Sequence, residues 1–188
     1  MKITLLFFAF AAFIAATEAS ELNRESRFDS VGDFVATIKA FHPAGSKGEL
    51  ASLFMISDRD EDDQGKLVPA IAIKACANIW SDDESALVFG TANPPTYATR
   101  SSIGVLFLLV HHRDAWRIAD VLRFAATGKE AEVSAELTAF AGSGRPLGSK
   151  GFVPVVTVKE SQGGRGYAYD TCASYKFVGS KLKRFELE

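Results

Sequence analysis

The sequence predicts an α+β protein, with N-terminal helices packed on a curved, mainly antiparallel β-sheet and extra hairpin strands at the C-terminal end. Two observations predict this class. Apolar residues in the first half recur at helical spacing, whereas those in the second half alternate or form short β-branched runs. Glycine and proline clusters separate the strand-like runs, as expected for antiparallel hairpins. We expect one globular domain over residues 20–188, which is within the usual size of a domain.

The clearest helix is predicted over Val31–Phe41. Asp29-Ser30 offers an N-cap, and the apolar residues after it recur every three or four positions. His42-Pro43 ends the helix, because the residue before a proline avoids the helical region. One or two further helical turns are expected around Leu50–Phe54.

A buried helix is also predicted over Lys66–Trp80, where Pro69 would be tolerated in the first turn. A strand is the alternative for Ile71–Ile73, because a short apolar run fits either element.

The second half is expected to consist of strands. Ile103–Val110 is apolar on both faces, which indicates a central strand covered on both sides. Trp116–Phe124 alternates and should pair with it across a turn at Arg113-Asp114. Further strands are expected over Ala86–Thr91, Val153–Val158, Tyr167–Val178 and Leu182–Leu187, with an alternating stretch around Val133 and Leu137.

The N-terminal segment predicts export. Lys2 is followed by an apolar run over Ile3–Ala16, which is 14 residues long and shorter than the ~20 needed to span a bilayer. Thr17 and Ala19 are small residues at the positions expected before a cleavage site. We therefore expect residues 1–19 to be a signal peptide and the mature protein to be soluble and periplasmic or extracellular. A buried N-terminal helix is the alternative.

Charge and motifs exclude several classes of function. The net charge is −2, made up of −6 over residues 1–99 and +4 over residues 100–188. No basic stripe is present, so no nucleic-acid partner is expected. No other segment is long enough to span a bilayer, so no membrane partner is expected after cleavage. Glycine-rich phosphate or dinucleotide motifs are absent, so no cofactor is expected. A small molecule or a glycan is the expected kind of ligand.

No metal site is expected either. Asp58, Asp60 and Asp62 resemble the start of a calcium loop, but Asp63 stands where that loop needs glycine and Pro69 where it needs glutamate. A solvated acidic loop is the favoured interpretation. Similarly, His111-His112 is interpreted as part of a surface turn, because consecutive strand residues point to opposite faces.

Asp120 is the candidate catalytic residue. Alternation places it on one face with Trp116, Ile118, Leu122 and Phe124. A carboxylate on an apolar face suits general acid–base catalysis. The alternative is an aspartate at the rim of a sheet, hydrogen-bonded to backbone or to an arginine.

Aromatic residues are the candidate ligand-binding residues. Tyr167, Tyr169 and Tyr175 share one face of a predicted strand with Phe177, and Trp116 lies on another strand. A flat aromatic face can stack on sugars, although such a face more often belongs to the core. Cys172 falls on the opposite face of the tyrosine strand, so we expect it and Cys76 to be free thiols.

The stretch Ala86–Phe124, with its strand, strand and "WRI" hairpin, resembles NTF2-like, SnoaL-type domains. The resemblance implies a curved sheet that wraps a helix and leaves a pocket. Some members of that family are isomerases or hydrolases and others only bind ligands. Asp120 is the type of residue that such pockets use, whereas the tail from Ala131 to Glu188 departs from the family's pattern.

These observations predict an exported, non-catalytic ligand-binding or structural module, because no convergent catalytic set accompanies the export signal. One alternative is an NTF2-like pocket enzyme that uses Asp120 as an acid or base. Another is a carbohydrate-binding β-domain that uses the tyrosine face. A cavity beside Asp120 would favour the enzyme, whereas exposure of Tyr167 and Tyr169 would favour the carbohydrate-binding domain.

Overall fold

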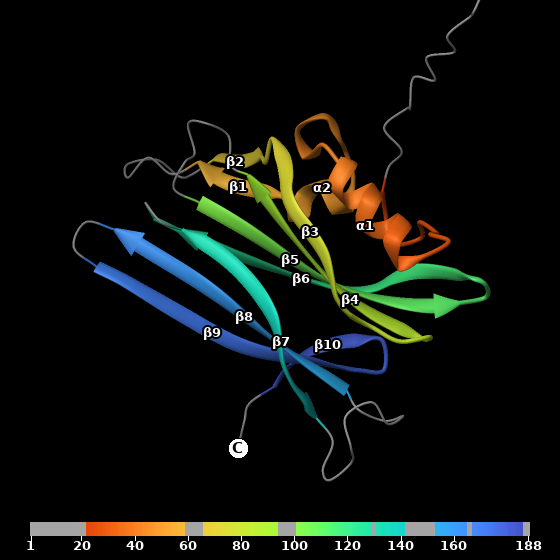
Figure 1. Cartoon of the computed structure of the whole chain (residues 1–188). Coiled ribbons are helices and arrows are strands. Elements are labelled where there is room, and N and C mark those ends of the chain that lie inside the picture. Colours follow the sequence, from red (N-terminus) through yellow and green to blue (C-terminus); the bar gives the residue numbers. More distant parts are fainter. Residues whose placement is uncertain are drawn as a thin grey trace, which may run out of the picture.

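Most of the described chain is β-structure. The computed structural model describes residues 22–58, 66–93, 101–128, 131–141, 153–164 and 167–185. It has three layers: a helical layer, a four-stranded antiparallel sheet and a second four-stranded antiparallel sheet (Figure 1). The predicted α+β class is therefore wrong, and so is the NTF2-like architecture that went with it. The residues predicted as extra C-terminal hairpins form a full second sheet, which covers one face of the first.

The elements follow one another simply along the chain. The helical layer contains α1 (Val31–Ala40), a 3-10 turn η1 (Pro43–Gly45) and α2 (Glu49–Leu53). A two-stranded ribbon follows, made of β1 (Met55–Asp58) and β2 (Lys66–Pro69). The first sheet contains β3 (Ala72–Ser81), β4 (Ser85–Asn93), β5 (Ser101–His112) and β6 (Ala115–Thr127) in that order. The second contains β7 (Glu132–Ala141), β8 (Val153–Gly164), β9 (Tyr167–Val178) and β10 (Lys181–Phe185), again as sequential neighbours.

Strand β5 is buried on both faces, as predicted. Its odd-numbered residues, such as Phe107, belong to the core under the helical layer, and its even-numbered residues, such as Leu108, belong to the core between the two sheets. Seven successive β5 residues, Ile103 to Leu109, are buried. The two cores therefore lie on opposite faces of this sheet, and β5 contributes residues to both.

Helix α1 lies where the sequence predicts it. The Ser30 hydroxyl accepts a hydrogen bond from the Asp33 N–H at 3.0 Å, which caps the first turn. Phe34 and Ile38 are completely buried against the first sheet. The helix ends at Ala40 with Phe41 as its C-cap, two residues before Pro43, as the proline rule predicts.

The predicted helix over Lys66–Trp80 is wrong, because this segment forms β2 and β3. Strand β3 pairs with β4 from Ala72 to Ser81, so its backbone groups are satisfied by the neighbouring strand. The alanines of this segment favour a helix intrinsically, but that preference is weak and pairing with a buried strand overrides it. Pro69 ends β2, and the next N–H, of Ala70, donates to the Phe54 carbonyl at 2.8 Å.

Arg123 on β6 fastens α2 and β1 to the first sheet. Its Nε donates to the Leu53 carbonyl at 3.0 Å, and its Nη2 donates to the Met55 carbonyl at 2.6 Å. These bonds satisfy backbone oxygens where a short helix ends. Burial lowers the pKa of the Arg123 guanidinium below its ordinary value.

A β-bulge in β6 changes which face each side chain occupies. The β5–β6 register passes from Leu109↔Ile118 to Leu108↔Asp120, so Ala119 is an extra residue. Ile118 and Trp116 therefore pack under the helical layer, whereas residues after the bulge with even numbers face the second sheet. The expectation that Asp120 shares a face with Trp116 and Ile118 is wrong for this reason.

The hairpin turn before the bulge follows the prediction. Arg113 and Asp114 have φ of 50° and 66°, as a two-residue turn of the primed type requires, and His111 pairs with Trp116. Only beyond Ala119 does the register differ from a regular hairpin.

The two sheets meet closely at Gly128. This residue has a φ of 120° and forms a parallel bridge with Gly163 of β8. A side chain at this position would overlap the Gly163 backbone. Only glycine meets both requirements, since it tolerates positive φ and has no Cβ.

Replacing Gly128 with alanine should therefore destabilise the fold. We expect Gly128→Ala to lower the free energy of unfolding by roughly 2–4 kcal/mol, because overlap and backbone strain add together. Gly45→Ala is the matched control, since a Cβ there has no neighbour within 4 Å and its φ is not positive. Urea denaturation of the two variants measures the difference. Equal stabilities would contradict the role assigned to the Gly128–Gly163 contact.

Candidate functional site

Asp120 joins the two sheets. Its Oδ2 accepts a hydrogen bond from the Leu182 N–H at 2.8 Å, and its Oδ1 lies 3.4 Å from Lys181 Nζ. The side chain of Asp120 is 14% exposed, whereas that of Lys181 is 61% exposed. Since Asp120 is on β6 and both partners are on β10, the carboxylate links an edge strand of each sheet.

Buried apolar side chains lie beside Asp120. Leu108, its cross-strand neighbour, is completely buried, and Leu182 is 8% exposed. A hollow of about 440 Å³ among the described residues lies elsewhere, between residues 22–29 and α1, where Arg27 and Asp33 help to line it. It is open and largely polar, and Asp120 does not reach it. This arrangement fits the alternative of a hydrogen-bonded rim aspartate better than a substrate-facing acid. The catalytic role of Asp120 stays a prediction.

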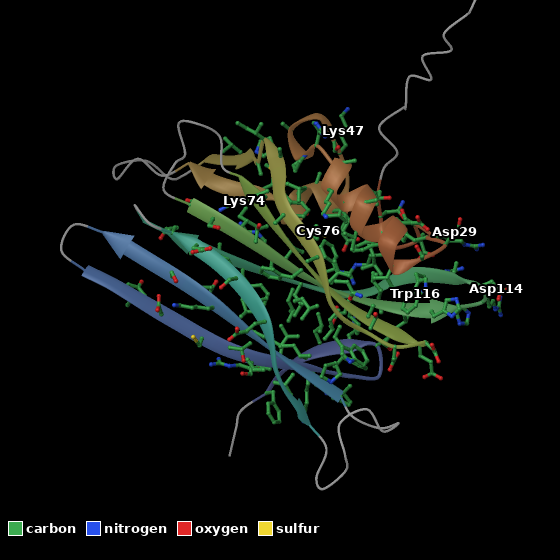
Figure 2. The ribbon with its side chains drawn as sticks, in the orientation of Figure 1. Asp29, Lys47, Lys74, Cys76, Asp114 and Trp116 are labelled. Atoms are coloured by element: carbon green, nitrogen blue, oxygen red, sulfur yellow. The ribbon has the colours of Figure 1, made fainter. Side chains whose placement is uncertain are left out.

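Trp116 lies on the helical side of the first sheet, near the turn that contains Asp114 (Figure 2). Its ring stacks on that of His111, with centroids 5.1 Å apart and planes 29° apart. Its backbone exchanges two hydrogen bonds with Phe28, at 2.8 and 3.0 Å. Trp116 thus attaches Phe28 to the free edge of β6 through the backbone, while its ring lies on the helical side of the sheet.

Tyr175 belongs to the core between the sheets. Its ring meets that of Phe124 edge to face, with centroids 5.2 Å apart. Phe177, two residues along β9, packs against Trp80 of β3. Burial raises the pKa of the Tyr175 hydroxyl above its ordinary value. At Tyr175 the predicted tyrosine face of this strand belongs to the core, and it packs against the first sheet and not against a helix.

Tyr169 lies on the same face of β9 but is 51% exposed. Its hydroxyl donates to Gln162 Oε1 at 2.7 Å, across the β8–β9 pair. Glu160 and Thr171 form the next cross-strand pair on this face, and Glu160 Oε1 accepts from the Ala125 N–H at 3.0 Å. We call Glu160, Gln162, Tyr169 and Thr171 the Tyr169 patch. The side chain of Tyr167 lies outside the described residues.

The predicted ligand-binding residues therefore do not converge on one site. Trp116 is under the helices, Tyr175 is between the sheets, and Tyr169 is at the surface. Gln162 and Thr171 were not expected beside Tyr169, although the register of the β8–β9 hairpin could have identified them. When residues are counted in both directions from the glycine-rich turn between β8 and β9, Gln162 is found opposite Tyr169.

The outer face of the second sheet is polar and internally bonded. Hydroxyl groups of Thr138, Thr157 and Ser174 form a row across three strands, with oxygens 2.8 Å apart at each step. Lys159 Nζ lies 2.7 Å from Asp170 Oδ2. Their hydrogen bond raises the pKa of the Lys159 ammonium and lowers that of the Asp170 carboxyl. Both groups are therefore charged at neutral pH and balance one another.

Both cysteines are free, as expected. Cys76 is buried in β3 under the helical layer (Figure 2), whereas Cys172 is exposed on the outer face of the second sheet. Both sheets and the core between them separate the two thiols. Burial raises the pKa of the Cys76 thiol to about 12, and nearby Lys39 offsets this only in part.

Several predicted features fall outside the described residues. They are the signal segment over residues 1–19 and the acidic run after Asp58. Among the residues that are described, no group of three or more His, Cys, Asp or Glu side chains could hold a metal ion. In the same part of the chain, no helix combines the length and apolar character needed to cross a membrane.

Substitutions at Asp120 should distinguish the contribution of its hydrogen bond to Leu182 from that of its ion pair with Lys181. Asp120→Ala leaves the buried Leu182 N–H without an acceptor, and we expect a loss of about 1–3 kcal/mol in unfolding free energy. Asp120→Asn keeps an acceptor oxygen and loses only the ion pair with exposed Lys181, so we expect a loss below about 1 kcal/mol. Thermal and urea denaturation of both variants, with Lys181→Ala as the control for the ion pair, measures these effects. Equal losses for Asn and Ala would contradict the hydrogen bond to Leu182.

The two thiols should differ in reactivity. In the native protein at pH 8 we expect Cys172 alone to react with a thiol reagent, because Cys76 is both buried and protonated. After denaturation without a reductant, two thiols should react. Mass spectrometry of the modified protein identifies the site. Rapid native labelling of Cys76 would contradict its burial.

Comparisons with known proteins identify no family for this chain. No protein-family model matches the chain, and neither the curated proteins nor the solved structures gave a match. The resemblance to NTF2-like domains stays a prediction about relationship only, since the α+β fold that it implied is wrong.

Proposed function

We propose that this protein is an exported, non-catalytic binding module that holds its ligand on an exposed surface. The observation that supports this most is the engagement of Asp120 by Leu182 and Lys181 between two packed sheets. A general acid or base must reach the reacting group of a substrate. Here the carboxylate instead accepts a bond from the backbone of β10, beside apolar side chains that are themselves buried.

The second sheet is the layer that we assign to binding. The helical layer and the first sheet bury their apolar faces against each other, whereas the second sheet presents exposed side chains such as that of Tyr169. Flat surfaces of antiparallel sheets suit extended or planar ligands, because alternate side chains project from a rigid backbone. Export rests on the sequence pattern of residues 1–19.

The proposal is tested by measuring whether the protein binds a ligand and whether it converts any substrate to product. Purified protein and Asp120→Asn are incubated with soluble polysaccharides, phospholipid vesicles and chromogenic ester and glycoside substrates. We expect one class of probe to bind with affinities equal within about twofold for the two proteins, and no product to form. The expectation follows because Asp120→Asn preserves the fold and removes only the carboxylate's charge and basicity.

Turnover by the wild-type protein that Asp120→Asn abolishes would contradict the proposal. Lys181→Ala is the control, since it removes the same ion pair but leaves the carboxylate in place. A loss of turnover in Asp120→Asn alone would then identify the carboxylate as catalytic.

A further inference from the structure

We infer that Asp120 and Glu160 form a reciprocal clasp, which holds the facing edges of the two sheets shut against strand pairing with a second copy of this chain. The inference goes beyond the proposed binding function, because the clasp needs no ligand. It starts from two hydrogen bonds that cross between the sheets in opposite directions. Asp120 Oδ2 on β6 accepts from the Leu182 N–H of β10 at 2.8 Å. Glu160 Oε1 on β8 accepts from the Ala125 N–H of β6 at 3.0 Å.

Both of these N–H groups belong to edge strands. Strand β6 is an edge of the first sheet, and β10 is an edge of the second. In an antiparallel sheet, an edge strand turns alternate N–H and C=O groups away from its single neighbour. The Ala125 and Leu182 N–H groups donate to carboxylates of the opposite sheet, so both point out of their own sheets. Each is therefore a group with which an added strand would pair.

The edge of β6 is blocked at other places as well. At the start of the strand, Phe28 and Trp116 exchange two backbone hydrogen bonds, at 2.8 and 3.0 Å. The bulge at Ala119 bends the strand beyond that bridge. Covering segments, bulges and inward-pointing charges are the means by which natural proteins protect sheet edges. Glu160 adds the third of these at the far end of the strand, on Ala125.

The two carboxylates are better explained by the N–H groups that they accept than by packing. The side chain of Asp120 is 14% exposed, and Glu160, in the Tyr169 patch, is half-buried. Removing a carboxylate from water is unfavourable unless hydrogen bonds compensate it. An apolar residue in place of Glu160 would continue the buried row of Val156 and Val158, but it would leave the Ala125 N–H without an acceptor.

Opening the clasp would make β6 a pairing strand for a second copy. Exposed edge strands pair with other chains, and two copies of one strand can pair antiparallel about a two-fold axis. Strand β10 is the poorer pairing strand, because Lys181, Lys183 and Arg184 would bring like charges together across the new interface. The second copy is therefore expected to pair through its own β6.

The mass of a double alanine variant in solution tests the inference. Asp120→Ala combined with Glu160→Ala removes both acceptors. Asp120→Asn combined with Glu160→Gln is the matched control, because it removes the same two charges but keeps an acceptor oxygen at each position. In size-exclusion chromatography with light scattering, we expect the control to keep the wild-type mass at every concentration. The double alanine variant should rise to about twice that mass as its concentration increases.

Hydrogen exchange of the Ala125 amide shows which strand pairs. In a dilute solution of the double alanine variant, this amide should exchange at least about tenfold faster than in the wild type, because its acceptor is gone. As the protein concentration rises, its exchange should slow again, since the added strand protects it. Association caused by general unfolding would not restore this protection.

Three results would overturn the inference: a double alanine variant that keeps the wild-type mass at every concentration, equal association of the amide control, or association that leaves the Ala125 amide unprotected. Circular dichroism shows whether the double alanine variant folds. If it does not fold, Glu160→Ala alone is the test variant, because it opens the β6 edge while the bond between Asp120 and Leu182 stays in place. The same three results, measured on that variant against Glu160→Gln, then decide the question.

Discussion

The burial of β5 on both faces is the constraint on which the rest of the molecule depends. A strand with Phe107 and Leu109 on one face and Leu106 and Leu108 on the other must exclude water from both. Removing apolar surface from water is the main favourable term in folding, at roughly 25 cal/mol per Å². The helical layer covers one face and the second sheet covers the other. Neither layer could be lost without exposing half of the strand.

The sequence was sufficient to identify features that depend on local or one-dimensional patterns. The double-sided burial of β5 followed from its unbroken apolar run, and α1 followed from its cap, its spacing and Pro43. The β3 strand could not be found in this way, because its alanines favour a helix and only pairing with β4 decides otherwise. The bulge at Ala119 was equally hidden, since one extra residue leaves no mark in the alternation on either side of it. That one residue moved Asp120 to a different neighbourhood from the one expected.

The candidate sites depend even more on long-range structure. Asp120 meets β10 residues that are more than sixty positions away in sequence, so its partners were beyond any local argument. Tyr169 was identified from the sequence as one of a row of aromatics, but the sequence did not distinguish it from Tyr175. The difference arises from long-range packing, since the Tyr175 ring meets Phe124 of the first sheet, whereas the Tyr169 hydroxyl bonds to Gln162 within its own sheet. The exposure of one aromatic and the burial of the other are thus properties of how two sheets are aligned.

The order of the strands has a consequence for how the chain acquires its structure. Each sheet is a run of sequential neighbours, β3 to β6 and then β7 to β10, and the chain passes from one to the other at Gly128. Contacts within a sheet are therefore local in sequence, which favours rapid formation, whereas contacts between the sheets require the whole chain. During synthesis the first sheet can assemble under its helices while the strands that cover its other face are still absent. In that interval Leu87, Leu106 and Leu108 lie on an open apolar surface. The second sheet is thus the cover of this surface, and without that cover the apolar side chains would be open to contact with another chain.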